Sequence, residues 1–252
     1  MPIENPKFHA TLSRRAALTG LLQMRHNPML LELAQECGYD FIVLDRQLGT
    51  FNDREFSESV IALTRTQGLI SMVRAPAHDM DCIRDALDRG IDAIIAPKIS
   101  TVDDAQSITR LTLSYRTTSV FVVIESATGV ANAEAILALE GVRGALVGPI
   151  NLSTDLGRPR DYANPVFRTQ FEKAERAATL NGKVVGTVPN DIYTAQELIS
   201  RGHRLLILGA DRDLLRSAMS ARMEKQGPIA TLGASGSNLG SANTPLGRLI
   251  SK

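Results

Sequence analysis

Eight short apolar runs, each followed by a longer amphipathic segment, constrain the fold of this chain more than any other feature. The runs cover Ala17–Leu22, Phe41–Leu44, Leu69–Val73, Ala93–Ala96, Val120–Ile124, Ala145–Val147, Lys183–Thr187 and Leu205–Leu208. Short, continuously apolar runs are typical of parallel strands buried on both faces, and the segments between them have helical spacing. The sequence therefore predicts eight consecutive strand–helix units.

Capping residues and glycines delimit the predicted helices. Asn52–Glu55 and Thr101–Asp104 resemble capping boxes, and Asn27-Pro28 resembles an N-cap followed by proline at the first helical position. The predicted helices are Met29–Cys37, Asp53–Thr66, Met80–Arg89, Val102–Leu113, Val130–Leu139, Pro165–Leu180, Tyr193–Ser200 and Asp213–Glu224. Glycines expected just after helices, before the next strand, are Gly38, Gly68, Gly90, Gly182 and Gly202.

A closed barrel accounts best for these units. The 252 residues match the usual size of one (β/α)8 (TIM) barrel, and no domain-sized break interrupts the pattern. An open, doubly wound sheet is the alternative, but no Gly-x-Gly-x-x-Gly follows the first run. We expect an N-terminal extension at residues 1–14, a single barrel at 15–225 and a flexible Gly/Ser-rich tail at 226–252.

The composition excludes several classes of partner. Lys and Arg number 28 against 27 Asp and Glu, which gives no electrostatic footprint for nucleic acid or an anionic membrane. No apolar run approaches the length of a membrane span, and Met1–Ser13 lacks the apolar run of a signal peptide. Cys37 and Cys82 are expected to be reduced thiols. We expect a cytoplasmic protein.

Reacting groups in a β/α barrel lie at the C-terminal ends of strands and in the loops that follow. Here these positions hold Asp45 after the second strand, Arg74 at the end of the third and Lys98 after the fourth. Glu125 ends the fifth strand, and the turn Gly148-Pro149-Ile150-Asn151 follows the sixth.

The chemistry of these groups leaves alternatives open. A carboxylate such as Glu125 at the end of a buried strand needs a partner, which would be Arg74 or a hard divalent cation. The planar fork of Arg74 suits a substrate carboxylate or enolate oxygen, although a structural arginine is equally common there. The turn after the sixth strand could direct the amides of Ile150 and Asn151 at a carboxylate.

Motifs at the strand ends carry a resemblance to a known family. They are Leu44-Asp45, Val73-Arg74, Ala96-Pro97-Lys98, Ile124–Val130 and Gly141–Gly157. Together they resemble the HpcH/HpaI aldolase and citrate lyase superfamily, over roughly Arg15 to Arg222.

The resemblance implies a carbon–carbon lyase, aldolase or condensing enzyme that acts on a small 2-oxo acid through an enolate. The substrate would be pyruvate-, oxaloacetate- or citrate-like. Glu125 matches the family's metal-binding glutamate and Arg74 its enolate-binding arginine, which implies Mg²⁺ or Mn²⁺ as cofactor. Relatives assemble as trimers or hexamers, so a homo-oligomer is expected as well.

Four departures from the family pattern qualify these roles. Asn151 stands where a metal-binding aspartate is expected, Leu48 where the acid–base histidine is expected, and Val123 in place of a glutamine. A loop before the fifth strand is also missing, since Ile99–Ser119 holds little more than a helix. A metal held by Glu125 and Asn151 should therefore bind weakly or not at all.

The strand-end positions and the resemblance together predict the site. Arg74 and Asp45 are the predicted catalytic residues, and Arg74 with the turn Gly148-Pro149-Ile150 is predicted to bind substrate. His26, Arg46 or Asp45 could supply the missing proton transfer, and Lys98 could form a Schiff base. The rival hypothesis is a catalytically degenerate barrel that binds a ligand or a partner.

Overall fold

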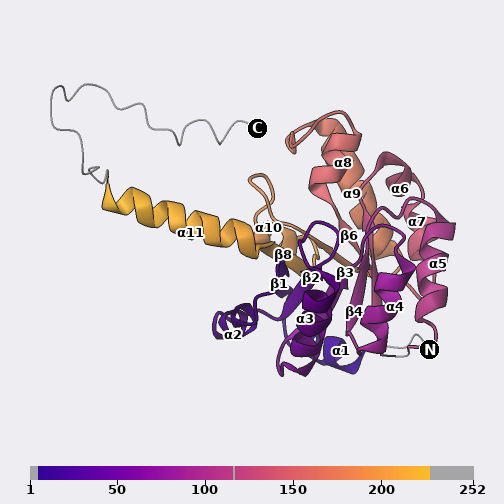
Figure 1. Cartoon of the computed structure of the whole chain (residues 1–252). Coiled ribbons are helices and arrows are strands. Elements are labelled where there is room, and N and C mark those ends of the chain that lie inside the picture. Colours follow the sequence, from indigo (N-terminus) through magenta and orange to yellow (C-terminus); the bar gives the residue numbers. More distant parts are fainter. Residues whose placement is uncertain (1–4, 116, 228–252) are drawn as a thin grey trace. The chain divides into compact units, whose positions relative to one another are not determined.

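The computed structural model describes residues 5–115 and 117–227. Its eight parallel strands pair in chain order, and β8 pairs with β1 to close the barrel (Figure 1). The strands are β1 (Leu18–Gln23), β2 (Phe41–Asp45), β3 (Ile70–Arg74), β4 (Ala93–Ala96), β5 (Ser119–Ile124), β6 (Gly144–Val147), β7 (Val184–Thr187) and β8 (Leu205–Ala210). The predicted closed barrel is confirmed, and the open sheet is wrong.

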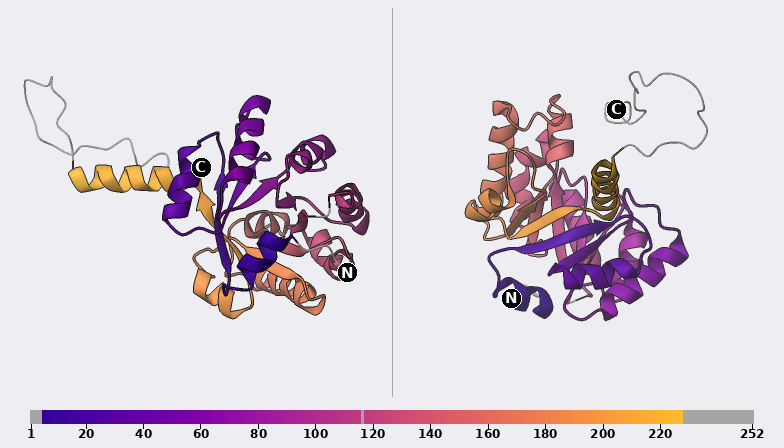
Figure 2. Two further views of the ribbon diagram at one scale, coloured as in Figure 1. Left: turned by 90° about the horizontal axis from the view of Figure 1, so that it is seen from below. Right: turned by 90° about the vertical axis from the view of Figure 1, so that its left-hand side faces the viewer.

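Helices lie between successive strands. They are α2 (Met29–Glu36), α3 (Asp53–Arg65), α4 (Met80–Asp88), α5 (Val102–Thr112), α6 (Ala127–Ala131), α7 (Ala133–Leu137), α8 (Pro149–Asp155), α9 (Pro165–Leu180) and α10 (Ala195–Ser200). Before the barrel comes α1 (Pro6–Leu12), and after it α11 (Asp211–Gln226). Seen from below, the helices between the strands surround the barrel (Figure 2, left). Within the described ranges, no helix is both long and apolar enough to cross a membrane.

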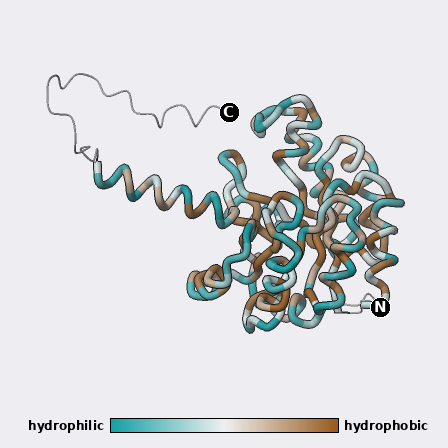
Figure 3. The backbone as a smooth tube through the Cα atoms, in the orientation of Figure 1, coloured by the Kyte–Doolittle hydropathy of each residue, from teal (hydrophilic) through white to brown (hydrophobic). Residues whose placement is uncertain are grey.

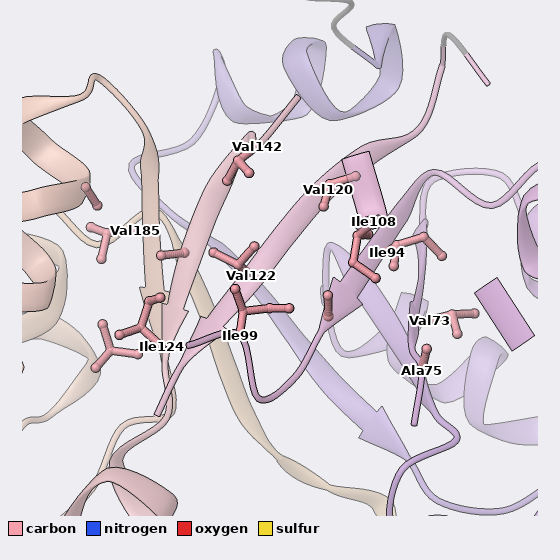
Figure 4. Close-up of a cluster of buried hydrophobic side chains, with 14 of the residues drawn as sticks. Val73, Ala75, Ile94, Ile99, Ile108, Val120, Val122, Ile124, Val142 and Val185 are labelled. Atoms are coloured by element: carbon pink, nitrogen blue, oxygen red, sulfur yellow. The ribbon is translucent and has the colours of Figure 1, made fainter. Parts of the chain in front are cut away.

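Two apolar clusters hold the barrel together, because successive side chains of a strand point to opposite faces. In β5, Phe121 and Val123 belong to the cluster inside the barrel. The alternate residues Val120, Val122 and Ile124 belong to the cluster between strands and helices (Figure 4). Figure 3 shows hydrophobic residues in the middle of the barrel and hydrophilic residues on its outer turns. This double burial explains why the strands are continuously apolar in sequence.

Helix α1 closes the N-terminal end of the barrel. Its Phe8 and Leu12 belong to the interior cluster, and the rings of Phe8 and Phe121 lie 5.3 Å apart. Asn5 caps this helix by accepting a hydrogen bond from the Phe8 N–H. The predicted N-terminal extension thus contains a helix that seals one end, which leaves the C-terminal end of the strands as the open mouth.

The capping predictions are borne out with one exception. Asn52 and Thr101 form the expected capping boxes at the starts of α3 and α5, and the five predicted C-terminal glycines all have positive φ. Helix α2, however, is preceded by Pro28 and has no side-chain cap, so the predicted Asn27 cap is wrong. Asn27 instead contributes its carbonyl oxygen, which accepts from Leu30 N–H and from the Gln23 side chain.

The chain divides into two units, Met1–Leu215, which contains the barrel, and Arg216–Lys252. Of the second unit the structure describes the remainder of α11 and Gly227. The predicted flexible tail at 226–252 lies almost entirely outside the described residues.

Candidate active site

Polar side chains gather at the barrel mouth because β2 and β3 end there in charged residues and β5 is followed by one. Asp45 and Arg74 are the final residues of β2 and β3 and lie opposite each other in the sheet register. Glu125 directly follows β5, and Asn151 lies in the first turn of α8 after β6. The structure thus brings together the residues that the strand-end rule predicted.

Asp45 and Arg74 form a bidentate ion pair. Arg74 Nε donates to Asp45 Oδ1 at 2.8 Å, and Nη2 donates to Oδ2 at 2.6 Å. Asp45 is fully buried, and its Oδ1 also accepts from the backbone N–H groups of Gln47 and Leu48. The paired fork and the buried acceptor fix the guanidinium plane, while the Arg74 side chain remains 20% exposed.

Glu125 has two protein donors and does not pair with Arg74. Its Oε1 accepts the backbone N–H of Lys98 at 2.8 Å, and its Oε2 accepts Asn151 Nδ2 at 2.6 Å. The expected alternative of an Arg74–Glu125 salt bridge is therefore wrong, because Arg74 is turned to Asp45 on the neighbouring strand. Glu125 is 8% exposed, so its carboxylate keeps only a small contact with solvent.

Gly148 leaves the space that Glu125 occupies. A Cβ added at Gly148 would lie 2.9 Å from Glu125 Cβ and 3.1 Å from its Oε2. The φ of Gly148 is −86°, which any residue can adopt, so close contact and not backbone conformation requires glycine here. Ile150, in the same predicted turn, is 44% exposed, and Pro149 is buried at the start of α8.

The candidates for proton transfer are mostly held elsewhere. His26 Nδ1 lies 2.8 Å from Ser59 Oγ on α3. Arg46 donates to the Phe51 carbonyl and to the Asp53 carboxylate, also beside α3. Leu48 is 65% exposed and offers no titratable group. His26 and Arg46 are thus engaged by contacts away from the Asp45–Arg74 pair, and Leu48 cannot transfer a proton.

Lys98 contributes through its backbone, which the sequence did not predict. Its φ is +56°, a left-handed conformation that is uncommon for a residue with a side chain. This conformation accompanies the hydrogen bond from the Lys98 N–H to Glu125. Backbone strain of this kind costs on the order of 1–3 kcal/mol and clusters at functional sites. Neither the strain nor the bond has a sequence signal, because both depend on the loop conformation.

The donor set at the mouth fits a divalent cation poorly. Across residues 5–115 and 117–227, no group of three or more His, Cys, Asp or Glu side chains could hold a metal ion. Asp45 is engaged by Arg74, so Glu125 is the one carboxylate of the predicted metal pair. The Asn151 amide directs an N–H group at this carboxylate, whereas a cation needs its oxygen.

Comparisons with known proteins agree with the strand-end motifs. The family model for HpcH/HpaI aldolase/citrate lyase matches residues 19–218. A 4-hydroxy-4-methyl-2-oxoglutarate aldolase from Chaetomium globosum is 30% identical, over 70% of this chain and 76% of the relative.

Solved structures show the same fold. An HpcH/HpaI aldolase/citrate lyase family protein from Burkholderia cenocepacia J2315 has a TM-score of 0.78 and 26% identity, over 87% of this chain and 99% of that one. The citrate lyase beta subunit of M. tuberculosis, complexed with oxaloacetate and magnesium, has a TM-score of 0.60 and 20% identity, over 82% and 97%. The protein described here therefore belongs to the HpcH/HpaI aldolase/citrate lyase family.

Proposed function

We propose that this protein cleaves or forms a carbon–carbon bond of a small 2-oxo acid through an enolate that Arg74 stabilises. The observation that carries the proposal is the bidentate Asp45–Arg74 pair at the mouth of the barrel. Nε and Nη2 of Arg74 bind Asp45, so Nη1 is the guanidinium nitrogen left for a substrate oxygen. The similar aldolase from Chaetomium globosum, by its name, also acts on a 2-oxo acid.

The enolate is the intermediate that most needs stabilisation. When the C3–C4 bond of a 2-oxo acid breaks, its electron pair forms the C2=C3 double bond of the enolate. Negative charge then develops on the oxygen bound to C2. A fixed cation that already faces this oxygen lowers the barrier without reorganising, which is commonly worth several kcal/mol. The buried carboxylate of Asp45 supplies this fixed orientation. We therefore propose that Arg74 contacts the enolate oxygen and that Asp45 positions Arg74.

The turn after β6 is the proposed site for the substrate carboxylate. The N–H groups of the first turn of a helix have no partner within the helix, and here they belong to Ile150 and Asn151. Gly148 and Pro149 bring this turn beside Glu125. The substrate would then lie between the turn and Arg74.

Glu125 and Asn151 are the proposed ligands of a weakly bound Mg²⁺ or Mn²⁺. Rotation of the Asn151 amide would replace its N–H group by an oxygen beside Glu125 Oε2, at the loss of the present hydrogen bond. When bound, the cation would add Lewis-acid stabilisation of the same oxyanion. Because this pair has one carboxylate instead of two, we expect it to bind the metal weakly. The proposed reaction does not depend on the metal.

The chain is further proposed to act as a homo-oligomer, because α11 has no buried residue and exposes several large apolar side chains. A second candidate function is binding without catalysis. Leu48 at the position of the proton-transfer group supports this alternative.

The test is enolate formation in the Arg74→Ala and Arg74→Lys variants. Exchange of the pyruvate methyl protons in D₂O and decarboxylation of oxaloacetate both report the enolate, without knowledge of the natural acceptor. We expect Arg74→Ala to lower both rates at least about 100-fold, and Arg74→Lys to recover only part, because Lys lacks the planar fork. The control is Arg54→Ala, whose exposed side chain pairs with Glu58 on α3. Equal rates in wild type and Arg74→Ala would reject the assignment, and pyruvate binding without either reaction would favour the binding protein.

A further inference from the structure

Three side chains inside the barrel keep contact with solvent on one half of the mouth. Val123, Leu146 and Ile207, from β5, β6 and β8, are 5–6% exposed. The interior side chains of β2, β3 and β4, namely Val43, Met72 and Ile95, are fully buried. Near the mouth, the interior side chains of β5, β6 and β8 are thus more exposed to solvent than those of β2, β3 and β4.

The next residue of each strand on the same face explains this asymmetry. Asp45 follows Val43, and Arg74 follows Met72, so the ion pair covers the first half. Gly148 follows Leu146, and the β-bulge of β8 makes Ala210, which pairs with Leu22, the next residue after Ile207 on this face, so no large side chain covers these two. Gly148 and Ala210 therefore leave the apolar side chains of Leu146 and Ile207 uncovered.

Apolar side chains also border this opening. Leu22 on β1 and Val188 after β7 are partly buried and pack against the interior cluster. The polar residues His26 and Arg46, which follow β1 and β2, are held by contacts with α3 and the segment that leads into it. We call Leu22, Val123, Leu146, Val188 and Ile207 the apolar subsite.

We propose that the apolar subsite selects 2-oxo acids whose chain beyond the reacting carbons is alkyl and not hydroxylated or charged. This inference rests on the proposed function, which places the carboxylate and oxo group of the substrate beside Arg74. The remainder of the molecule then has to extend over the open half of the mouth. There it meets methyl groups on the floor and on both sides. Both oxygens of Glu125, beside Val123, already accept hydrogen bonds from Lys98 and Asn151, so a hydroxyl would lose its hydrogen bonds to water without gaining an unengaged partner.

Two 2-oxo acids of equal length make this selectivity measurable. 2-Oxohexanoate ends in a methyl group, and 5-hydroxy-2-oxopentanoate ends in a hydroxyl at the same position. Calorimetry at constant pH gives both dissociation constants without any need for turnover. An apolar site discriminates against a hydroxyl in place of a methyl group by roughly 10- to 100-fold, so we expect 2-oxohexanoate to bind at least about tenfold more tightly.

The two acids also differ in their hydration in solution. Comparing their affinity ratio in wild type and in a near-isosteric variant cancels this difference, because it is the same for both proteins. Val188→Thr keeps the shape of the side chain and adds one hydroxyl to the subsite. We expect the tenfold preference to fall to about threefold or less, mainly through tighter binding of the hydroxy acid. Val166→Thr is the matched control, because Val166 lies 52% exposed on α9, and it should leave the preference unchanged.

The outcomes separate the subsite from the proposed function. Equal affinity for the two acids, tighter binding of the hydroxy acid, or an unchanged preference in Val188→Thr would overturn the subsite even if pyruvate exchange is normal. The expected preference in a protein that catalyses neither exchange nor decarboxylation would support the subsite and overturn the catalytic assignment. If neither acid binds, the subsite is wrong, and pyruvate exchange decides the proposed function separately.

Discussion

Asn151 sets the charge of the mouth, since its amide stands beside Glu125 where the family pattern has a second carboxylate. The Nδ2–Oε2 distance is 2.6 Å, and the Lys98 N–H satisfies the other oxygen of Glu125. Both oxygens of Glu125 are therefore hydrogen-bonded by protein donors without a cation. This local arrangement explains how a buried carboxylate can persist in a site with few metal ligands.

Asn151→Asp should restore metal affinity. The variant places two carboxylates side by side, which repel each other until a divalent cation binds between them. We expect the Mn²⁺ dissociation constant, measured by electron paramagnetic resonance of free Mn²⁺, to fall at least about tenfold. We also expect the metal-free variant to melt at a lower temperature than wild type, and Mn²⁺ to reverse this loss.

The matched control for this variant is Asn164→Asp, which caps α9 and should leave both quantities nearly unchanged, because aspartate is an equally good N-cap. If Asn151→Asp binds Mn²⁺ no better than wild type, Glu125 and Asn151 are not a metal pair.

Sequence reasoning placed the site residues correctly at the strand ends but could not identify their partners. The sequence leaves Arg74 or a divalent cation as the partner of Glu125, and the structure pairs Arg74 with Asp45. Both carboxylates lie near the mouth, and the choice depends on side-chain directions and on the left-handed backbone at Lys98. Strand periodicity contains no information about either.

At the scale of elements, long periodic segments were predicted well and short helices were not. Helix α9 begins and ends as predicted, at Pro165 and Leu180. The seven-residue helices α1 and α8 were missed, because two turns are too short to show an amphipathic period. The predicted helix Val130–Leu139 is instead α6 and α7, which meet at Asn132, whose side chain donates to the Ser100 carbonyl.

The ion pairs that join α9 to the segment between α10 and β8 should make stability fall in acid. Burial raises the pKa of Glu175 on α9, but hydrogen bonds from His203 and Arg201 outweigh it and lower the pKa below the ordinary value. A carboxyl whose pKa is lower in the folded state stabilises the fold above its unfolded pKa, near 4.5, and loses this contribution as pH falls through the folded value.

Glu175→Gln should therefore lower the free energy of unfolding at pH 7 by about 3 kcal/mol, as expected when one partner of a buried ion pair is removed. Urea titrations at several pH values should also show a weaker dependence on pH below about 4.5 than wild type. Glu172→Gln is the control, because Glu172 lies 3.7 Å from Arg201 with 57% of its side chain exposed and should cost less than about 1 kcal/mol. Parallel pH profiles for Glu175→Gln and wild type would contradict the role of this carboxylate.

The barrel consists of eight similar strand–helix units, and their order in the sequence is also their order around the barrel. The closed sheet was predictable because each unit carries its own strand, helix and turn signals. The role of α11 was not predictable from the same signals. Its apolar residues Leu215, Met219 and Met223 recur every fourth position, as on a core-facing helix, yet they are 56–62% exposed.

A second copy of the chain is the proposed partner for this face of α11, and its disruption should reduce the size of the assembly. Met219→Glu combined with Met223→Glu places two charges on the face, and burying them in an apolar contact would cost several kcal/mol. We expect light scattering after gel filtration to give a multiple of 27.3 kDa for wild type and a smaller multiple for the double variant. Ser217→Glu with Ala221→Glu adds the same charge to the opposite face of the helix and should keep the wild-type mass. A wild-type protein that is already a monomer, or a double variant with unchanged mass, would show that this face does not join copies of the chain.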